Sequence, residues 1–81
     1  MRVTVRLFSV LRRGVDADAV ALELPEGARL RDAIESLLAR HEALRPYAPS
    51  CMAAVGLEYA PPDHELRDGD EISLIPPVSG G

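Results

Sequence analysis

The sequence has 81 residues, which is the size of one small domain. Its formal net charge of −4 argues against general nucleic-acid binding, which depends on clustered positive charge. No apolar run approaches the roughly 20 residues that a membrane span needs, and no signal-peptide segment opens the chain, so we expect a cytoplasmic protein without membrane contact.

Two strands are predicted in the first third of the chain. Residues 2–10 alternate between apolar and polar side chains, which is typical of a strand with one buried face. Residues 11–18 contain Gly14 and two aspartates, and we expect a loop there. Residues 19–24 alternate again, so the two strands are predicted to pair as an antiparallel hairpin.

A helix is expected from about residue 29 to residue 43. Neither position 28 nor 29 is a Ser, Thr, Asp or Asn, so we expect a weak N-cap, partly offset by Asp32 near the positive end of the helix dipole. The apolar stripe follows helical spacing and consists of Leu30, Ala33, Ile34, Leu37, Leu38 and His41.

The last third of the chain is predicted to complete the sheet. Residues 51–57 are apolar and are expected to form a buried strand, and residues 58–60 a short edge strand. Asp68-Gly69-Asp70 predicts a tight turn before a final strand at residues 71–75. The order β-β-α-β-(β)-β, with one amphipathic helix, predicts an α+β fold of the β-grasp, or ubiquitin-like, type: a mixed sheet with the main helix across one face.

Residues 1–75 are therefore expected to form the domain, and residues 76–81 an extended tail that ends in Gly80-Gly81. Glycine has no Cβ atom, so this pair can enter a channel too narrow for other residues. The reactive group at the tip is the α-carboxylate of Gly81. We expect this carboxylate to be the functional group, with Pro77, Val78, Ser79 and Gly80 as the inserted segment.

The ending resembles that of the ubiquitin-like sulfur carriers, the family that includes the small subunit of molybdopterin synthase (MoaD). The shared pattern runs from Leu66 to Gly81, as L-x-D-G-D-E, a hydrophobic run and then P-P-V-S-G-G. Leu7-Phe8 and Ala54-Val55 support the resemblance, while Gly56 departs from the asparagine that often follows Ala-Val in the family.

The resemblance implies a sulfur-transfer cycle in a heterotetrameric synthase. A MoeB-like enzyme would use ATP to adenylate the carboxylate of Gly81, which sulfur then converts to a thiocarboxylate. Inside a MoaE-like large subunit, the thiocarboxylate would donate sulfur to a pterin precursor and form the dithiolene of molybdopterin. The chain itself would be a non-catalytic carrier that binds no cofactor or metal, with Phe8, Tyr59 and Ile75 at the partner interface.

Three other functions remain open at this point. The chain resembles sister carriers that serve thiamine thiazole, cysteine or tRNA thiolation, and its terminus is also competent to act as a ubiquitin-like protein modifier. A plain binding module is the third. Cys51 is either a persulfide relay or a small buried hydrophobe, and Arg12 and Arg13 are either solvated or dock an acidic partner.

Overall fold

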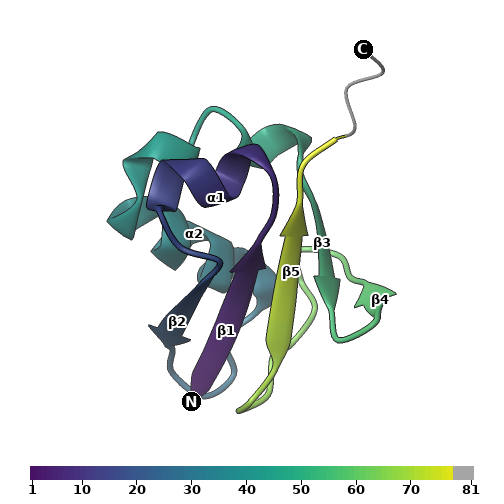
Figure 1. The fold of residues 1–81 in the computed structure, drawn as a ribbon. Helices are drawn as coiled ribbons and strands as arrows, with labels where there is room; N and C mark the ends of the chain where they lie inside the picture. Colours follow the sequence, from purple (N-terminus) through teal and green to yellow (C-terminus); the bar gives the residue numbers. More distant parts are fainter. Residues whose placement is uncertain (78–81) are drawn as a thin grey trace.

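The computed structural model describes residues 1–77, and their five strands form one mixed sheet (Figure 1). The strand order is β2-β1-β5-β3-β4, with β1 and β5 parallel and the other neighbouring pairs antiparallel. The strands are β1 Arg2–Leu7, β2 Ala19–Glu23, β3 Met52–Val55, β4 Glu58–Tyr59 and β5 Glu71–Ile75. The predicted α+β arrangement, a mixed sheet with one main helix, is confirmed.

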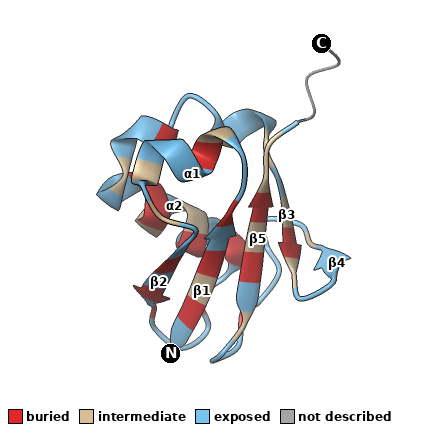
Figure 2. Cartoon of the chain, viewed as in Figure 1, coloured by how far each residue is buried: buried red, intermediate tan, exposed pale blue. Residues whose placement is uncertain are grey.

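The main helix α2, Leu30–Arg40, lies across one face of the sheet and buries four residues of the predicted apolar stripe. The other two, Ile34 and the C-cap residue His41, are half-buried. Leu30, Ala33 and Leu37 are at most 1% exposed. The buried residues gather between this helix and the sheet, as the red segments of Figure 2 show. The opposite face of the sheet is left without a covering layer of helix.

The N-terminus of α2 is better capped than the sequence predicts. The Arg29 N–H donates to the Asp32 carboxylate at 2.8 Å. The N–H groups of Leu30 and Arg31 donate to the carbonyls of His64 and Pro62, at 2.8 and 2.9 Å. The first-turn donors, which have no partner inside a helix, are thus satisfied by a loop distant in sequence.

The prediction of a loop at residues 11–18, and of a strand reaching residue 10, is wrong. β1 ends at Leu7, and a short helix α1 spans Val10–Val15. Leu11 is completely buried, which anchors this helix in the core. A Cβ atom on Gly14 would lie 3.3 Å from the Leu44 side chain, so the glycine read as a loop signal instead permits close helix packing.

The chain after Arg40 does not continue as one helix to residue 43, as the sequence predicted. α2 ends at Arg40, and two short 3₁₀ helices follow, η1 Glu42–Leu44 and η2 Ala48–Ser50. Leu44, the last residue of η1, is completely buried, and η1 contacts both α1 and α2. The helix stops three residues before the predicted end because the chain bends to bury Leu44.

The prediction of a buried strand over residues 51–57 is wrong in both extent and burial. β3 has four residues, of which only Ala54 is buried. Gly56 has φ +63°, a left-handed conformation that ends the strand in a turn, and Leu57 at this turn is fully exposed. β3 is largely exposed because one face of the sheet is uncovered and because its outer neighbour, β4, has only two residues.

Candidate functional site

The last described residues leave the sheet at the end where β1 also stops. β1 and β5 are parallel, and Leu7 pairs with Leu74, so both central strands end at the same edge of the sheet. Pro76 and Pro77 follow β5 directly; lacking backbone N–H groups, they cannot continue a hydrogen-bonded ladder. Pro77 is exposed. The predicted site residues Val78, Ser79, Gly80 and Gly81 lie outside the described residues.

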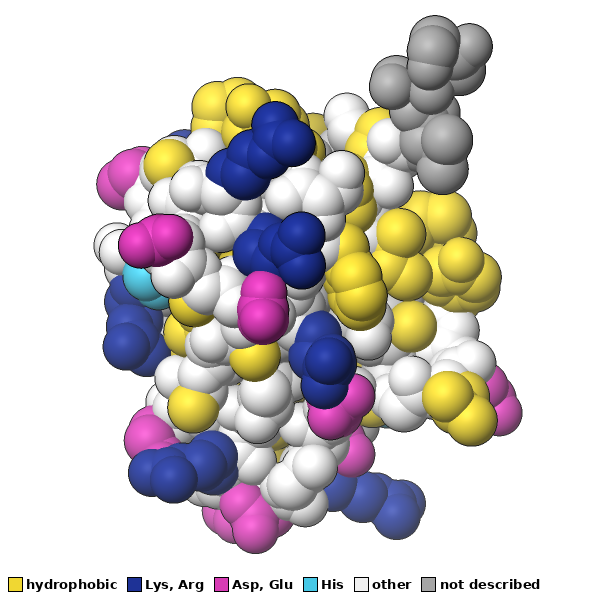
Figure 3. Space-filling view, in the orientation of Figure 1, with side chains coloured by type: hydrophobic (Ala, Val, Ile, Leu, Met, Phe, Trp, Pro, Cys, Tyr) yellow, Lys and Arg dark blue, Asp and Glu magenta, His cyan; other side chains and the backbone are white. Residues whose placement is uncertain are grey.

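An exposed apolar surface adjoins this exit. We call it the outer patch and define it as Phe8, Met52, Tyr59 and Ile75. Phe8 is 42% exposed, Met52 55% and Tyr59 65%, while Ile75 is half-buried. Figure 3 shows apolar side chains gathered on this face near the departing chain.

The strand register explains how Met52, Tyr59 and Ile75 come together. Ile75 pairs with Met52 on the neighbouring strand, and Ala54 pairs with both Tyr59 and Ser73. Residues directly opposite in antiparallel strands point to the same face of the sheet. The intervening residue Ala53 pairs with the buried Leu74, so Met52, Tyr59 and Ile75 face the uncovered side.

The register therefore brings Tyr59 and Ile75, two of the three residues predicted at the partner interface, onto one face and adds Met52. The third, Phe8, is exposed and directly follows β1, whose last residue Leu7 pairs with Leu74. Their role in binding stays a prediction. Sequence reasoning missed Met52 because an apolar residue in an apolar strand was assigned to the core. Successive residues of a strand point to opposite faces of the sheet, and Ala53 faces the core, so Met52 faces the uncovered side. Contiguous apolar surface of this kind marks sites of protein–protein contact.

Cys51 does not have the environment of a reactive thiol. Its Sγ donates to the carbonyl of Tyr47 at 3.2 Å, and the residue is half-buried. Burial raises the pKa of the Cys51 thiol above its ordinary value, which disfavours the nucleophilic thiolate. These observations favour the small buried hydrophobe over a persulfide relay.

The carboxylates near the last turn have structural partners. Asp68 accepts from the Arg2 N–H at 2.7 Å, and Asp70 accepts from the Arg67 N–H at 2.8 Å. Over residues 1–77, no group of three His, Cys, Asp or Glu side chains is arranged to hold a metal ion. The turn formation predicted for Asp68-Gly69-Asp70 is confirmed, with Gly69 at φ +87°.

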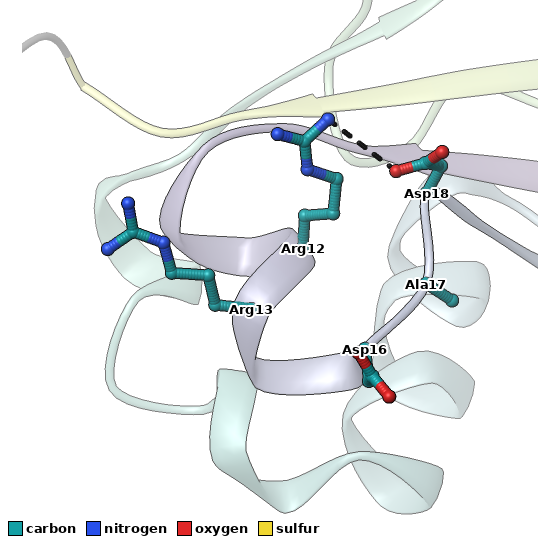
Figure 4. A pocket seen from close by; sticks show the side chains of 5 residues that line it. All are labelled: Arg12, Arg13, Asp16, Ala17 and Asp18. Carbon is teal, nitrogen blue, oxygen red and sulfur yellow. Dashed lines mark ion pairs between the residues drawn. The ribbon is translucent and has the colours of Figure 1, made fainter.

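Two of the hollows on the described surface are relevant to binding. One lies between α2 and the β3–β4 edge and is lined by Leu30, Ile34, Cys51, Met52, Ala53, Tyr59, Ala60, Pro61 and Pro62. The other is a shallow, charged hollow beside α1, lined by Arg12, Arg13, Asp16, Ala17 and Asp18 (Figure 4). Neither brings a nucleophile and a general base together, so in residues 1–77 these hollows offer binding surface and no acid–base machinery. In the same range, none of the helices has the length and apolar character needed to cross a membrane.

Comparison with known proteins gives consistent matches. Residues 5–81 match the model of the ThiS family. The chain is 37% identical, over 83 aligned residues and 100% of both chains, to the molybdopterin synthase sulfur carrier subunit of Chlamydomonas reinhardtii. The family resemblance predicted from the sequence is thereby confirmed.

Two solved structures resemble the fold over 100% of both chains. SAMP1 from Haloferax volcanii superposes with a TM-score of 0.93 at 26% identity. A chain in the complex of subunits 1 and 2 of the molybdopterin-converting factor from Helicobacter pylori superposes with a TM-score of 0.71 at 28% identity. The β-grasp fold predicted from the sequence is confirmed.

Proposed function

The chain belongs to the ThiS family, and from this premise we propose that it is the sulfur carrier subunit of molybdopterin synthase. The observation that carries the proposal is a family match that runs from β1 through Gly81, including the P-P-V-S-G-G segment. The relative from Chlamydomonas reinhardtii carries that function in its name and aligns over its full length. The outer patch beside the exit of the chain supplies a docking surface that such a carrier needs.

The chemistry we propose takes place at the α-carboxylate of Gly81. A carboxylate is a poor acyl donor because its leaving group would be oxide or hydroxide. Attack of a carboxylate oxygen on the α-phosphorus of ATP releases pyrophosphate and gives an acyl-adenylate. Hydrosulfide then displaces AMP and loses its proton, which leaves a thiocarboxylate. One difficult substitution is thereby divided into two easier ones.

The thiocarboxylate sulfur next forms a bond to a side-chain carbon of the pterin precursor, and an oxygen substituent leaves that carbon. Water then cleaves the acyl–sulfur bond, which leaves the sulfur on the pterin and returns the carboxylate of Gly81. Two such transfers supply the two sulfurs of the dithiolene. None of these steps requires an acid, a base or a cofactor on the carrier. ATP is used by the activating partner, and the role of this chain is to present its terminus.

We assign the outer patch to the large, MoaE-like subunit. A chain of similar fold is found in a complex of two molybdopterin-converting subunits, which supports a partner of this kind. Large apolar side chains near the centre of an interface carry most of its binding energy. The outer patch fits that role because its side chains are accessible and because Ile75, which directly precedes Pro76, pairs with Met52.

The remaining parts of the proposal concern activation and setting. We propose that a MoeB-like adenylating enzyme receives the same terminus, that the assembled synthase is a heterotetramer and that the cycle runs in the cytoplasm. In this scheme Pro77, Val78, Ser79 and Gly80 enter each partner's channel ahead of Gly81. Neither nucleic acid nor membrane takes part.

A reconstituted synthase reaction tests the function. The chain, loaded with sulfur, is mixed with a MoaE-like subunit and the pterin precursor, and molybdopterin is measured. We expect product from the chain ending at Gly81 and none from a variant extended by one alanine. Equal product from an extended chain that mass spectrometry shows to be untrimmed would refute the proposal.

A second function is favoured by one observation. SAMP1, named as a small archaeal modifier protein, has a TM-score of 0.93 to this chain. An acyl-adenylate on Gly81 could equally be attacked by a lysine amine of another protein. Ladders of conjugates after incubation with the activating enzyme and a lysate would support that function, and their absence together with molybdopterin formation would support the carrier.

A further inference from the structure

An arginine-bearing surface lies at the same end of the molecule as the departing chain. Because β1 and β5 end together, α1, which begins three residues after Leu7, is placed at this end (Figure 1). Arg12 and Arg13 project from α1 and are exposed. In Figure 4 both guanidinium groups point away from Asp16, which lies on the opposite side of the helix end.

These arginines are only loosely neutralised. Arg12 Nη1 lies 3.5 Å from Asp18 Oδ1, and the two side chains are 58% and 81% exposed. Arg6 Nη1 lies 3.9 Å from Glu71 Oε1, at the outer limit of an ion pair. Arg13 forms no ion pair with any residue from 1 to 77. Exposed pairs of this kind contribute little to stability, so these guanidinium groups can exchange partners at small cost.

The strand register places one of these arginines, Arg6, on the same face of the sheet as the outer patch. Arg6 pairs with Ser73, which pairs with Ala54, which pairs with Tyr59. Arg6 and Tyr59 therefore lie in one row across the uncovered face, with Ala19 of β2 beyond Arg6. Figure 3 shows arginine side chains in a column beside the apolar cluster.

We infer that Arg6, Arg12 and Arg13 form a basic rim that pairs with Asp and Glu carboxylates of the large subunit, beside the channel that takes the tail. The inference rests on the proposed function. Interfaces commonly surround an apolar centre with a polar rim, and rim charges act mainly on the rate and orientation of association. The chain as a whole carries a net charge of −4, so an acidic surface on the partner repels the chain in most orientations. The same surface attracts the guanidinium groups of the rim, which turns the tail toward the channel.

The test measures association rates between the chain and the large subunit by stopped flow, at low and at high salt. The rim variant is Arg12→Glu/Arg13→Glu. The matched control is Arg31→Glu/Arg67→Glu, which changes the net charge equally at two exposed arginines outside the rim. Circular dichroism establishes that both variants are folded.

We expect the rim variant to associate about tenfold more slowly at low salt and to lose most of the salt dependence, with the control changed about twofold or less. Equal slowing in both variants would show a general effect of net charge and overturn the inference, as would unchanged rates in both. Binding of the unaltered chain separates the two proposals. If it does not bind the large subunit at all, the proposed function fails and the rim with it; if it binds without regard to Arg12 and Arg13, the rim alone fails.

Discussion

Replacing Tyr59 with alanine should weaken binding of the large subunit without weakening the fold. A tyrosine offers about 200 Å² of surface. With 65% of Tyr59 exposed, about 130 Å² remain for a partner to cover. At about 25 cal/mol per Å², and allowing for the hydroxyl that stays hydrated, covering this surface contributes about 2 kcal/mol, or roughly a 30-fold change in Kd.

The effect on stability should be small because Tyr59 lies on the two-residue edge strand and outside the core. We expect the free energy of unfolding to change by less than about 0.5 kcal/mol. Isothermal titration calorimetry measures the Kd, and urea denaturation measures stability. Leu57→Ala is the matched control: Leu57 is a more exposed apolar residue of the same hairpin, but it lies at the turn beyond the outer patch.

The result that would refute this reasoning is an equal loss of affinity in Tyr59→Ala and Leu57→Ala. That outcome would mean that the partner responds to exposed apolar surface in general. An unchanged Kd for Tyr59→Ala would remove Tyr59 from the interface.

Three further predictions concern the core, the thiol and the amines. Leu11→Ala should lower the free energy of unfolding by about 2–5 kcal/mol in urea, because Leu11 is completely buried; a loss below about 1 kcal/mol would contradict the anchoring of α1. Burial raises the pKa of the Cys51 thiol, so Cys51 should react with iodoacetamide more slowly in the folded chain than in the urea-unfolded chain at the same pH. The free energy of unfolding linked to this thiol should fall as the pH rises above the thiol's pKa in the unfolded chain. Equal alkylation rates in the folded and unfolded chains would contradict this environment of Cys51. The nine Lys and Arg side chains of the sequence are all arginine, so the activated chain should form no lysine-linked polymer of itself on denaturing gels. The control variant Arg31→Lys supplies a lysine that can accept such a bond. Polymers of the unaltered sequence joined through a side-chain amide would contradict this prediction.

Most of the fold could be predicted from the alternation of apolar and polar residues in the strands and from the helical spacing of apolar residues in α2. β5 matches its predicted range, and β2 and the apolar stripe of α2 match closely, because each buries one face and that period is visible in the sequence. α1 was missed because Gly14 and the aspartates are typical of loops. What makes this segment helical is the burial of Leu11 and the contact with Leu44, which depend on a segment about thirty residues away and leave no local pattern.

Part of the candidate site could likewise be predicted from the sequence, and part of it could not. The P-P-V-S-G-G segment is recognisable from its residues alone, and so was the family. Met52 was not predicted, because its exposure depends on the sheet having one bare face and on its pairing with Ile75. The position of Arg12 and Arg13 at the end where the chain departs likewise required the parallel pairing of β1 with β5.

The most direct test of the central claim is to locate the sulfur after loading. The chain is incubated with a MoeB-like adenylating enzyme, ATP and a sulfur donor, digested, and its fragments are weighed by mass spectrometry. We predict that one oxygen is exchanged for sulfur in the fragment that contains Gly81, and that a chain lacking Gly80 and Gly81 acquires none. Sulfur on Cys51, or loading that survives the deletion, would contradict the account.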